Sequence, residues 1–307
     1  MPNPPQHDTP ALDTLVGSAI ETLERDSAID GGFTADDGGP APRLHLRSGF
    51  PSRFLSAKRD VLVYLPPGYE PRGSHRYPVL YLQDGQNLFD GRTSYVKGSS
   101  WMVGEAADRL IGEGEIQPLI IVGVYNTGAH RLEEYTPTRD LVYGGGKANL
   151  YGRLLIEELK PWVDGTYRTL DGAEHTGIGG SSLGGLVSLY LGLRRPDVFG
   201  RLAVLSPSVW WHRRSILSIV KKVDPVPRPR IWLDMGTNEG PTGVRNSDQL
   251  QQALLERGWR EGEDLLYTRV QGGRHDEPAW ALRVGPFLKF LFPAAVRDAS
   301  SPVIKSV

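Results

Sequence analysis

The feature that most constrains this chain is a serine flanked by glycines in the stretch EHTGIGGSSLGGLVSLY. An apolar run precedes this serine and a helix-like pattern follows it, which predicts a strand, a tight turn and a helix. A serine on such a turn has glycines two residues before and two residues after it, because side chains there would collide. Gly180, Ser182 and Gly184 satisfy this spacing. Ser181 does not, because Leu183 would occupy its second glycine position. Ser182 is therefore the candidate nucleophile.

Short β-rich runs alternate with helical patterns along the chain from Arg43 onward. Near-continuous apolar strands separated by amphipathic helices are typical of an α/β fold, in which helices cover both faces of a mostly parallel central sheet. Such a sheet binds ligands beyond the carboxyl ends of its strands. Besides the strand and helix around the serine, strands are predicted at DVLVYLP, PVLYLQD, PLIIVGVYN, RLAVLSP, RIWLDMG and DLLYTRVQGG, and helices near residues 101–113, 150–167, 247–257 and 280–292.

The N-terminal region differs in character from the rest of the chain. Residues 12–26 carry apolar positions at helical spacing, and residues 31–42 are rich in Gly, Pro and Asp. We therefore expect a helical arm and linker over residues 1–42 and a catalytic domain over residues 43–307. Neither a secretory signal nor a membrane-spanning run is visible, which favours a cytoplasmic protein without a membrane partner.

Charge and cysteine content exclude several classes of function. The 307 residues include 35 basic and 36 acidic side chains, with a net charge of -1 and no long run of one sign, so no nucleic-acid partner is expected. The chain has no cysteine, which excludes disulfides, thiolate catalysis and cysteine-based metal sites. A small molecule is therefore the expected partner, and nothing in the composition indicates an oligomeric state.

A serine nucleophile needs a base within hydrogen-bond reach, and that base is usually a histidine oriented by a carboxylate. Proteins with this type of serine turn present the three groups in the chain order Ser, acid, His. Of the seven histidines, His212 and His275 follow Ser182. His275 lies in the loop QGGRHDEPAW after a predicted strand, whereas His212 lies at a predicted helix start, where capping or substrate contact suits it better. His275 is therefore the candidate base.

The segment IWLDMGTNEG offers two candidates for the acid. Glu239 lies in the loop after the predicted strand, where a partner for the histidine is needed. Asp234 lies within the strand or at its end, where it could point into a neighbouring helix or pair with an arginine. Asp276 is a weaker third candidate, because its side chain cannot easily face the adjacent His275. We favour Glu239 as the acid and expect Asp234 to have a structural role.

The oxyanion of ester cleavage needs preorganised donors, one of which is the backbone amide after the nucleophile. That amide belongs to Leu183. The second donor is expected from the loop YLQDGQNLFD, as the amide of Gln86 or, less favoured, of Asn87. Oxygens of Asp84, Asn87 and Asp90 in this loop could instead bind a cation such as calcium, but their spacing fits no complete EF-hand loop. No metal site is therefore predicted.

Aromatic and charged side chains near the strand ends could line a substrate pocket, although each could equally pack a helix or form a surface ion pair. The two tryptophans that directly follow the strand end LSPS suit an aromatic acyl group or a sugar face. The candidates for substrate contact are Trp101, Arg131, Tyr135, Trp210 and Trp211.

Several segments together resemble the putative-esterase family of α/β hydrolases, namely YPVLYLQDGQNLFD, RLEEYTP, GGSSLGG, LSPSVWW, GTNEG and GGRHD. That family includes enterochelin and other siderophore esterases, feruloyl and acetyl-xylan esterases, S-formylglutathione hydrolase and mycolyltransferases. The resemblance runs from about Arg47 to Phe292 and implies an α/β-hydrolase fold. It also implies Ser182 as nucleophile, His275 as base and Glu239 as acid, although some siderophore esterases work with a Ser-His pair alone.

The residues and the resemblance together predict a carboxylic ester hydrolase that works through an acyl-enzyme and needs no metal or organic cofactor. The candidate substrates are a siderophore lactone, a sugar acyl ester and a small acyl ester. Two alternatives are acyl transfer to an alcohol by the same triad and a non-catalytic binding protein on the same fold.

Overall fold

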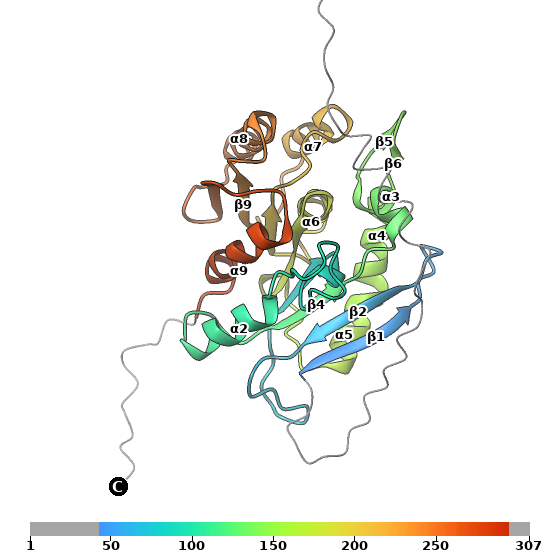
Figure 1. Ribbon diagram of the computed structural model, residues 1–307, viewed down its shortest axis with the longest axis vertical. Helices are drawn as coiled ribbons and strands as arrows, with labels where there is room; N and C mark the ends of the chain where they lie inside the picture. The colour runs from blue at the N-terminus through green and yellow to red at the C-terminus, as the bar shows by residue number, and fades with distance from the viewer. Residues whose placement is uncertain (1–42, 295–307) are drawn as a thin grey trace, which may run out of the picture. The chain divides into compact units, whose positions relative to one another are not determined.

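The computed structural model describes residues 43–294. The expected N-terminal arm and linker, residues 1–42, lie outside the described residues, as do residues 295–307. The described part contains an eight-stranded sheet and a two-stranded one, with helices between the strands (Figure 1). The strands are β1 (Leu44–Phe50), β2 (Arg59–Tyr64), β3 (Val79–Gln83), β4 (Ile120–Val124), β5 (Arg139–Asp140), β6 (Gly144–Gly145), β7 (Thr176–Ser181), β8 (Arg201–Leu205), β9 (Arg230–Gly236) and β10 (Leu265–Val270).

The large sheet has the strand order β1-β2-β4-β3-β7-β8-β9-β10. β2 runs antiparallel to β1 and to β4, and the other neighbouring pairs are parallel. This confirms the predicted α/β fold with a mostly parallel central sheet, and every predicted strand is present. The sequence pattern does not predict β1, because this edge strand leaves most of its side chains at least partly exposed and so carries no continuous apolar run.

Helices pack on both faces of the sheet. α2 and α9 contribute to one buried apolar cluster, and α4 to α8 contribute to the other. None of the described helices is both long and apolar enough to cross a membrane. The α-helices are α2 (Val103–Gly112), α3 (Arg131–Tyr135), α4 (Ala148–Arg153), α5 (Lys160–Thr166), α6 (Leu183–Arg194), α7 (Trp211–Lys222), α8 (Pro241–Glu256) and α9 (Glu277–Leu291); the π-helical segment is η3 (Leu154–Leu159), and the 3-10 turns are η1 (Gly85–Asn87), η2 (Gly128–His130) and η4 (Ala173–His175).

Strand β3 shows how the sheet divides the core between its two faces. Successive side chains of a strand point to opposite faces. Val79 and Tyr81 therefore belong to the cluster that includes α6, whereas Leu80 and Leu82 belong to the cluster that includes α2 and α9. A strand that is buried on both faces consists of one continuous apolar run, and this makes its signal in the sequence strong.

The loops at the carboxyl ends of the parallel strands carry the candidate site residues. Gln86 follows β3, Ser182 follows β7, Glu239 follows β9 and His275 follows β10. Because parallel strands end at the same edge of a sheet, these loops lie near one another despite their separation along the chain. The fold therefore places the predicted nucleophile, base, acid and second oxyanion donor at one edge.

A buried ion pair connects β2 to α3. Arg59 donates two hydrogen bonds to the carboxylate of Glu134, at 3.0 and 3.1 Å, and the two side chains are 0% and 2% exposed. The hydroxyl of Thr127 donates to the same carboxylate. Next to Glu134, the hydroxyl of Tyr135 accepts a hydrogen bond from the backbone amide of Asp84 at 3.3 Å. The ion pair therefore helps to hold the loop after β3.

We expect Arg59→Met to lower the free energy of unfolding by about 3 kcal/mol or more, because it leaves the Glu134 charge buried and unpaired. The double variant Arg59→Met/Glu134→Leu should recover part of this loss, since it removes both charges. Urea unfolding followed by tryptophan fluorescence measures both effects. A single variant that is no less stable than the double variant would contradict this account.

Candidate active site

Ser182 lies between β7 and α6 in a backbone conformation that is rare outside glycine, with φ 58° and ψ -123°. Its backbone amide donates to the carbonyl of Leu205 at 3.0 Å, which ties the turn to β8. A Cβ atom at Gly180 or Gly184 would lie 2.9 or 3.0 Å from the Cβ of Gln83, which is closer than side chains ordinarily approach. The predicted strand, turn and helix are therefore confirmed, and the close approach of β3 explains both glycines.

The two backbone amides predicted to face an oxyanion have no acceptor among the described residues. Leu183 is the first residue of α6, so its amide lies at a helix N-terminus, which favours negative charge. Gln86 lies in η1, a turn that begins at Asp84 with a left-handed φ of 57°. The side-chain oxygen of Gln86 accepts a hydrogen bond from the backbone amide of Asn126 at 3.3 Å, which holds this loop next to β4. Unpaired amides of this kind are suitable donors to a developing oxyanion.

His275 and Glu239 form a short hydrogen bond, with 2.6 Å between Nδ1 and Oε2. The imidazole is 46% exposed and the carboxylate side chain only 4%. The Trp280 ring packs against the His275 ring in an edge-to-face arrangement, with the ring centroids 4.9 Å apart. The structure thus brings the predicted base and the favoured acid together, with the base accessible and the acid shielded from water.

The donors around Glu239 hold it in its charged form. One oxygen, Oε1, accepts from the Ser206 hydroxyl at 2.6 Å, the Gly236 amide at 2.9 Å and the Arg283 guanidinium at 3.2 Å. Burial by itself raises the pKa of Glu239, but hydrogen bonds from His275 and Ser206 outweigh burial and hold this pKa below its ordinary value. Because the carboxylate is ionised, Nδ1 of His275 carries the shared hydrogen, which leaves Nε2 as an acceptor.

The hydroxyl of Ser182 lies 3.3 Å from the hydroxyl of Ser208, and no hydrogen bond of the described residues joins it to His275. Hydrogen bonds between catalytic groups are often long until a substrate binds. Ser208 follows β8, and its backbone amide donates to the carbonyl of Ser182 at 3.0 Å. No sequence signal singles out Ser208 beyond its place after a predicted strand.

Asp234 is fully buried in β9, and its carboxylate faces partners other than the histidine. It accepts from the Trp232 indole at 2.8 Å, from Arg283 at 2.8 Å and from the Ser206 amide at 3.2 Å. Burial raises the pKa of Asp234, although the charge of Arg283 opposes this rise. These partners support the structural role expected for Asp234. Arg283 comes from α9, and no pattern in the sequence marks it as part of this site.

The alternative base and the third acid candidate have local partners. The Asp276 side chain caps α9 by accepting from the Ala279 amide at 3.0 Å, and it also pairs with Arg274 at 2.9 Å. His212 lies near the start of α7, with Nδ1 2.9 Å from the hydroxyl of Thr138. Both side chains thus contribute to local structure.

Three of the five residues predicted to line a substrate pocket lie in the core. Trp101, Tyr135 and Trp211 are 2%, 0% and 1% exposed. Trp101 packs against Trp280 with ring centroids 5.9 Å apart, and the Trp211 indole donates to the carbonyl of Thr138 at 2.9 Å. Because their surfaces are covered by neighbouring protein atoms, we assign these three side chains to packing and not to substrate contact.

The other two candidates, Arg131 and Trp210, are accessible. Arg131 donates two hydrogen bonds of 2.7 Å to Asp84, and its side chain is 27% exposed. Trp210 is 47% exposed and lies two residues after Ser208, whose hydroxyl is next to Ser182. Trp210 therefore stays a candidate for substrate contact.

The oxygens considered for a cation site have other partners. The carboxylate of Asp84 is paired with Arg131. Asp90 pairs with Arg92 at 2.6 Å, and the side-chain oxygen of Asn87 accepts from the backbone amide of Tyr95 at 2.9 Å. Each of the three residues is thus engaged within the protein.

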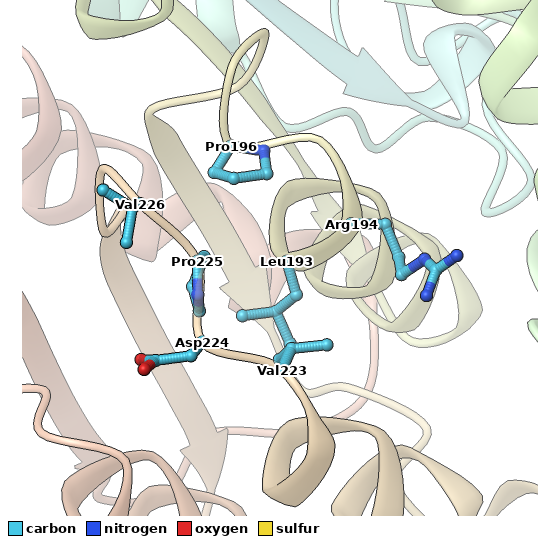
Figure 2. Close-up of a pocket in the computed structure, with 7 residues that line it drawn as sticks. All are labelled: Leu193, Arg194, Pro196, Val223, Asp224, Pro225 and Val226. Atoms are coloured by element: carbon cyan, nitrogen blue, oxygen red, sulfur yellow. The ribbon is translucent and has the colours of Figure 1, made fainter.

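A shallow surface hollow of about 280 Å³ lies at the far end of α6, where the end of that helix meets the segment after α7 (Figure 2). Leu193, Pro196, Val223 and Pro225 are among its lining residues. α6 has 12 residues and begins directly after Ser182, so its length of about 18 Å separates the hollow from the serine. The hollow is therefore not part of the candidate active site.

A serine on a strained strand-to-helix turn, followed along the chain by an acid and a histidine that meet at the strand ends, defines an α/β hydrolase. Comparison with known proteins identifies the family within this class. Residues 52–288 match the model of the family described as "Putative esterase", and the chain belongs to that family. It is a carboxylic ester hydrolase, as the resemblance of its motifs implies.

The chain is similar to individual proteins as well. The chain is 33% identical over 249 residues to the uncharacterized protein YjcH of Bacillus subtilis, covering 78% of this chain and 94% of YjcH. It is 32% identical over 238 residues to an endo-1,4-beta-xylanase/feruloyl esterase of Xylanibacter ruminicola, covering 75% of this chain and 29% of that protein. The crystal structure of the enterobactin esterase FES from Shigella flexneri in the presence of enterobactin has the same fold, with a TM-score of 0.67 at 24% identity over 82% of this chain and 59% of that one.

We expect Asp234→Asn to reduce stability without abolishing ester hydrolysis. The asparagine NH2 group would point at the N–H groups of Trp232 or Arg283, and two donors cannot form a hydrogen bond with each other. The free energy of unfolding should fall by about 1–3 kcal/mol. The folded variant should keep kcat within about tenfold of the wild type. Urea unfolding and steady-state kinetics test this, and a stable but inactive variant would instead place Asp234 in the reaction.

Proposed function

We propose that this protein is a serine ester hydrolase in which Ser182 is the nucleophile, His275 the base and Glu239 the acid. One observation carries this proposal. The ionised carboxylate of Glu239 bonds Nδ1 of an accessible imidazole at 2.6 Å, at the sheet edge where the strained turn presents Ser182. A Ser-His pair without a required acid is the alternative that the kinetics below distinguish.

The reaction proceeds in two steps through an acyl-enzyme. The hydroxyl oxygen of Ser182 attacks the ester carbonyl carbon while Nε2 of His275 takes its proton, and Glu239 stabilises the imidazolium that forms. His275 then returns the proton to the leaving alcohol, and the acyl group stays on Ser182. Water attacks this ester with the same imidazole as base, which releases the acid and restores the serine.

The developing oxyanion needs donors that are already in place. The amides of Leu183 and Gln86 are suitable because neither has an acceptor among the described residues, and Leu183 opens a helix whose N-terminus favours negative charge. Both donors are backbone groups, so neither side chain itself donates to the oxyanion.

Three substrate classes fit this chemistry: a siderophore lactone, a sugar acyl ester and a small acyl ester. The similarity to a feruloyl esterase and to an enterobactin esterase supports the first two. Trp210 is exposed and follows Ser208 by two residues, and it supports a substrate with an aromatic group or a sugar. A cytoplasmic location stays a prediction.

A substrate panel tests the proposed reaction. It compares p-nitrophenyl esters of graded chain length with feruloyl, acetyl-sugar and catecholate-lactone esters, each with and without an added acceptor alcohol. Release of free acid supports hydrolysis, whereas a new ester of the added alcohol as main product indicates acyl transfer. Inertness of the folded protein toward the whole panel contradicts the proposal.

We expect Ser182→Ala to abolish ester hydrolysis while the fold is kept, because the turn depends on the glycines around it and not on the hydroxyl. Removing a triad nucleophile costs on the order of 10⁶-fold in kcat. Steady-state kinetics and thermal unfolding measure both properties, with Ser181→Ala as the neighbouring control. If Ser182→Ala kept more than about a hundredth of the activity and Ser181→Ala lost it, the assignment of the nucleophile would be wrong.

Glu239→Gln should lower kcat by roughly two to four orders of magnitude with little change in KM, because the amide keeps the shape of the side chain but not its charge. The measurement is the kinetics of the folded variant on a p-nitrophenyl ester. Near-wild-type kcat would remove Glu239 from the triad. Such a result, together with an active Asp234→Asn variant, would point to a Ser182–His275 pair.

A further inference from the structure

Ser206 lies at the centre of a buried cluster of polar side chains that contacts the Glu239–His275 pair. Its hydroxyl oxygen is 2.6 Å from Oε1 of Glu239, 2.7 Å from Nη1 of Arg283 and 3.1 Å from Nε1 of Trp280. The residue is 1% exposed, and its backbone φ of 42° is rare outside glycine. A strained backbone conformation persists only where contacts with the surrounding structure hold it in place, and such conformations cluster at functional sites.

The chemistry of the donors fixes the direction of every hydrogen bond at Ser206. The indole of Trp280 and the guanidinium of Arg283 can only donate, so both donate to the hydroxyl oxygen. The single hydrogen of the hydroxyl therefore points to Oε1 of Glu239. That oxygen also accepts from Arg283 and from a backbone amide, so it carries no proton. Oε2 is left as the oxygen that meets His275.

The contacts close into a ring that restricts rotation of the acid. Ser206 bonds Glu239, Glu239 bonds His275, the His275 ring packs on Trp280, and Trp280 bonds back to Ser206. Turning the Glu239 carboxylate would break the hydrogen bonds at Oε1 together with the bond to the imidazole. The charge of Arg283, 2% exposed, lies beside this ring.

Arg283 also links the ring to the core. One nitrogen, Nη1, donates to Asp234 at 2.8 Å as well as to Ser206, and Nη2 donates to Glu239 at 3.2 Å and to the carbonyl of Arg274 at 3.1 Å. Asp234 is fully buried inside β9, so Arg283 connects that strand to the Glu239 carboxylate in the loop after it.

We propose that Ser206 and Arg283 are positioning residues of the hydrolase reaction, which hold Oε1 of Glu239 so that Oε2 keeps Nδ1 of His275 protonated and Nε2 free to accept the serine proton. This inference rests on the proposed function of Glu239 and His275. Ser206 and Arg283 act through Glu239, and neither is assigned a contact with the substrate.

The test is a double-mutant cycle between Ser206→Ala and Glu239→Gln, read as kcat and KM on a p-nitrophenyl ester. Ser206→Ala should lower kcat by about tenfold to a hundredfold, with KM within about twofold, since it removes a hydrogen bond to a charged group that acts only on the acid. In the Glu239→Gln background the same change should cost less than about twofold in kcat, because the group through which Ser206 acts is already disabled.

Ser188→Ala is the matched control. Ser188 is a fully buried serine of α6 whose hydroxyl has no hydrogen-bond partner among the described residues, so its loss should leave kcat unchanged. A kcat for Ser206→Ala equal to that of Ser188→Ala would overturn the proposal. A loss that is as large in the Glu239→Gln background as in the wild type would also overturn it. A fully active Glu239→Gln variant would instead overturn the proposed acid itself.

Arg283→Lys tests the arginine without removing its charge. A single ammonium group cannot reproduce the two-nitrogen contacts to Asp234, Ser206 and Glu239, so kcat should fall by about tenfold or more at unchanged KM. The fall should disappear in the Glu239→Gln background. Wild-type kcat in folded Arg283→Lys would exclude Arg283 from positioning, and Ser206→Ala decides the rest of the proposal if the lysine variant does not fold.

Discussion

The close packing of β7 in the middle of the sheet sets the geometry on which the rest of the site depends. A Cβ atom at Gly179 would lie 2.5 Å from the Cβ of Ala203 in β8, so the neighbouring strand leaves no space for a side chain. The chain leaves this crowded position by a sharp turn at Ser182, with a left-handed φ of 58°, and enters α6 directly. The turn places the hydroxyl beyond the strand end and the Leu183 amide at the start of the helix. The proposed nucleophile therefore owes its position to glycines on both sides of it.

Two carboxylates share one arginine, yet their surroundings shift their pKa values in opposite directions. Asp234 lies inside a strand, where burial raises its pKa and its partners are Arg283, an indole and a backbone amide. Glu239 lies in the loop beyond that strand, where hydrogen bonds from His275 and Ser206 outweigh burial and lower its pKa. The two pKa values differ because Asp234 lies inside β9, whereas Glu239 lies beyond its end, where other donors reach the carboxylate.

The sheet apart from β1 could be predicted because buried parallel strands are continuous apolar runs, and several helices could be predicted because they are amphipathic. Side-chain direction could not be predicted in the same way. Trp101, Tyr135 and Trp211 are candidates from the sequence for a substrate pocket near the strand ends, but the structure buries all three. A position near a strand end does not tell whether the side chain points toward the site or back into the core, since that depends on which helix covers it.

The sequence by itself determined the turn at Ser182, the succession of strands along the chain apart from β1, and the loops that carry Glu239 and His275. Each of these depends on local spacing and on the rule that parallel strands end at one edge. Only the tertiary structure decided which carboxylate meets the histidine. That choice depends on Arg283, which follows Asp234 by 49 residues and engages its carboxylate. It also depends on Ser206, whose hydroxyl can donate only once and does so to Glu239. Such partners are set by packing between distant segments, which no local pattern records.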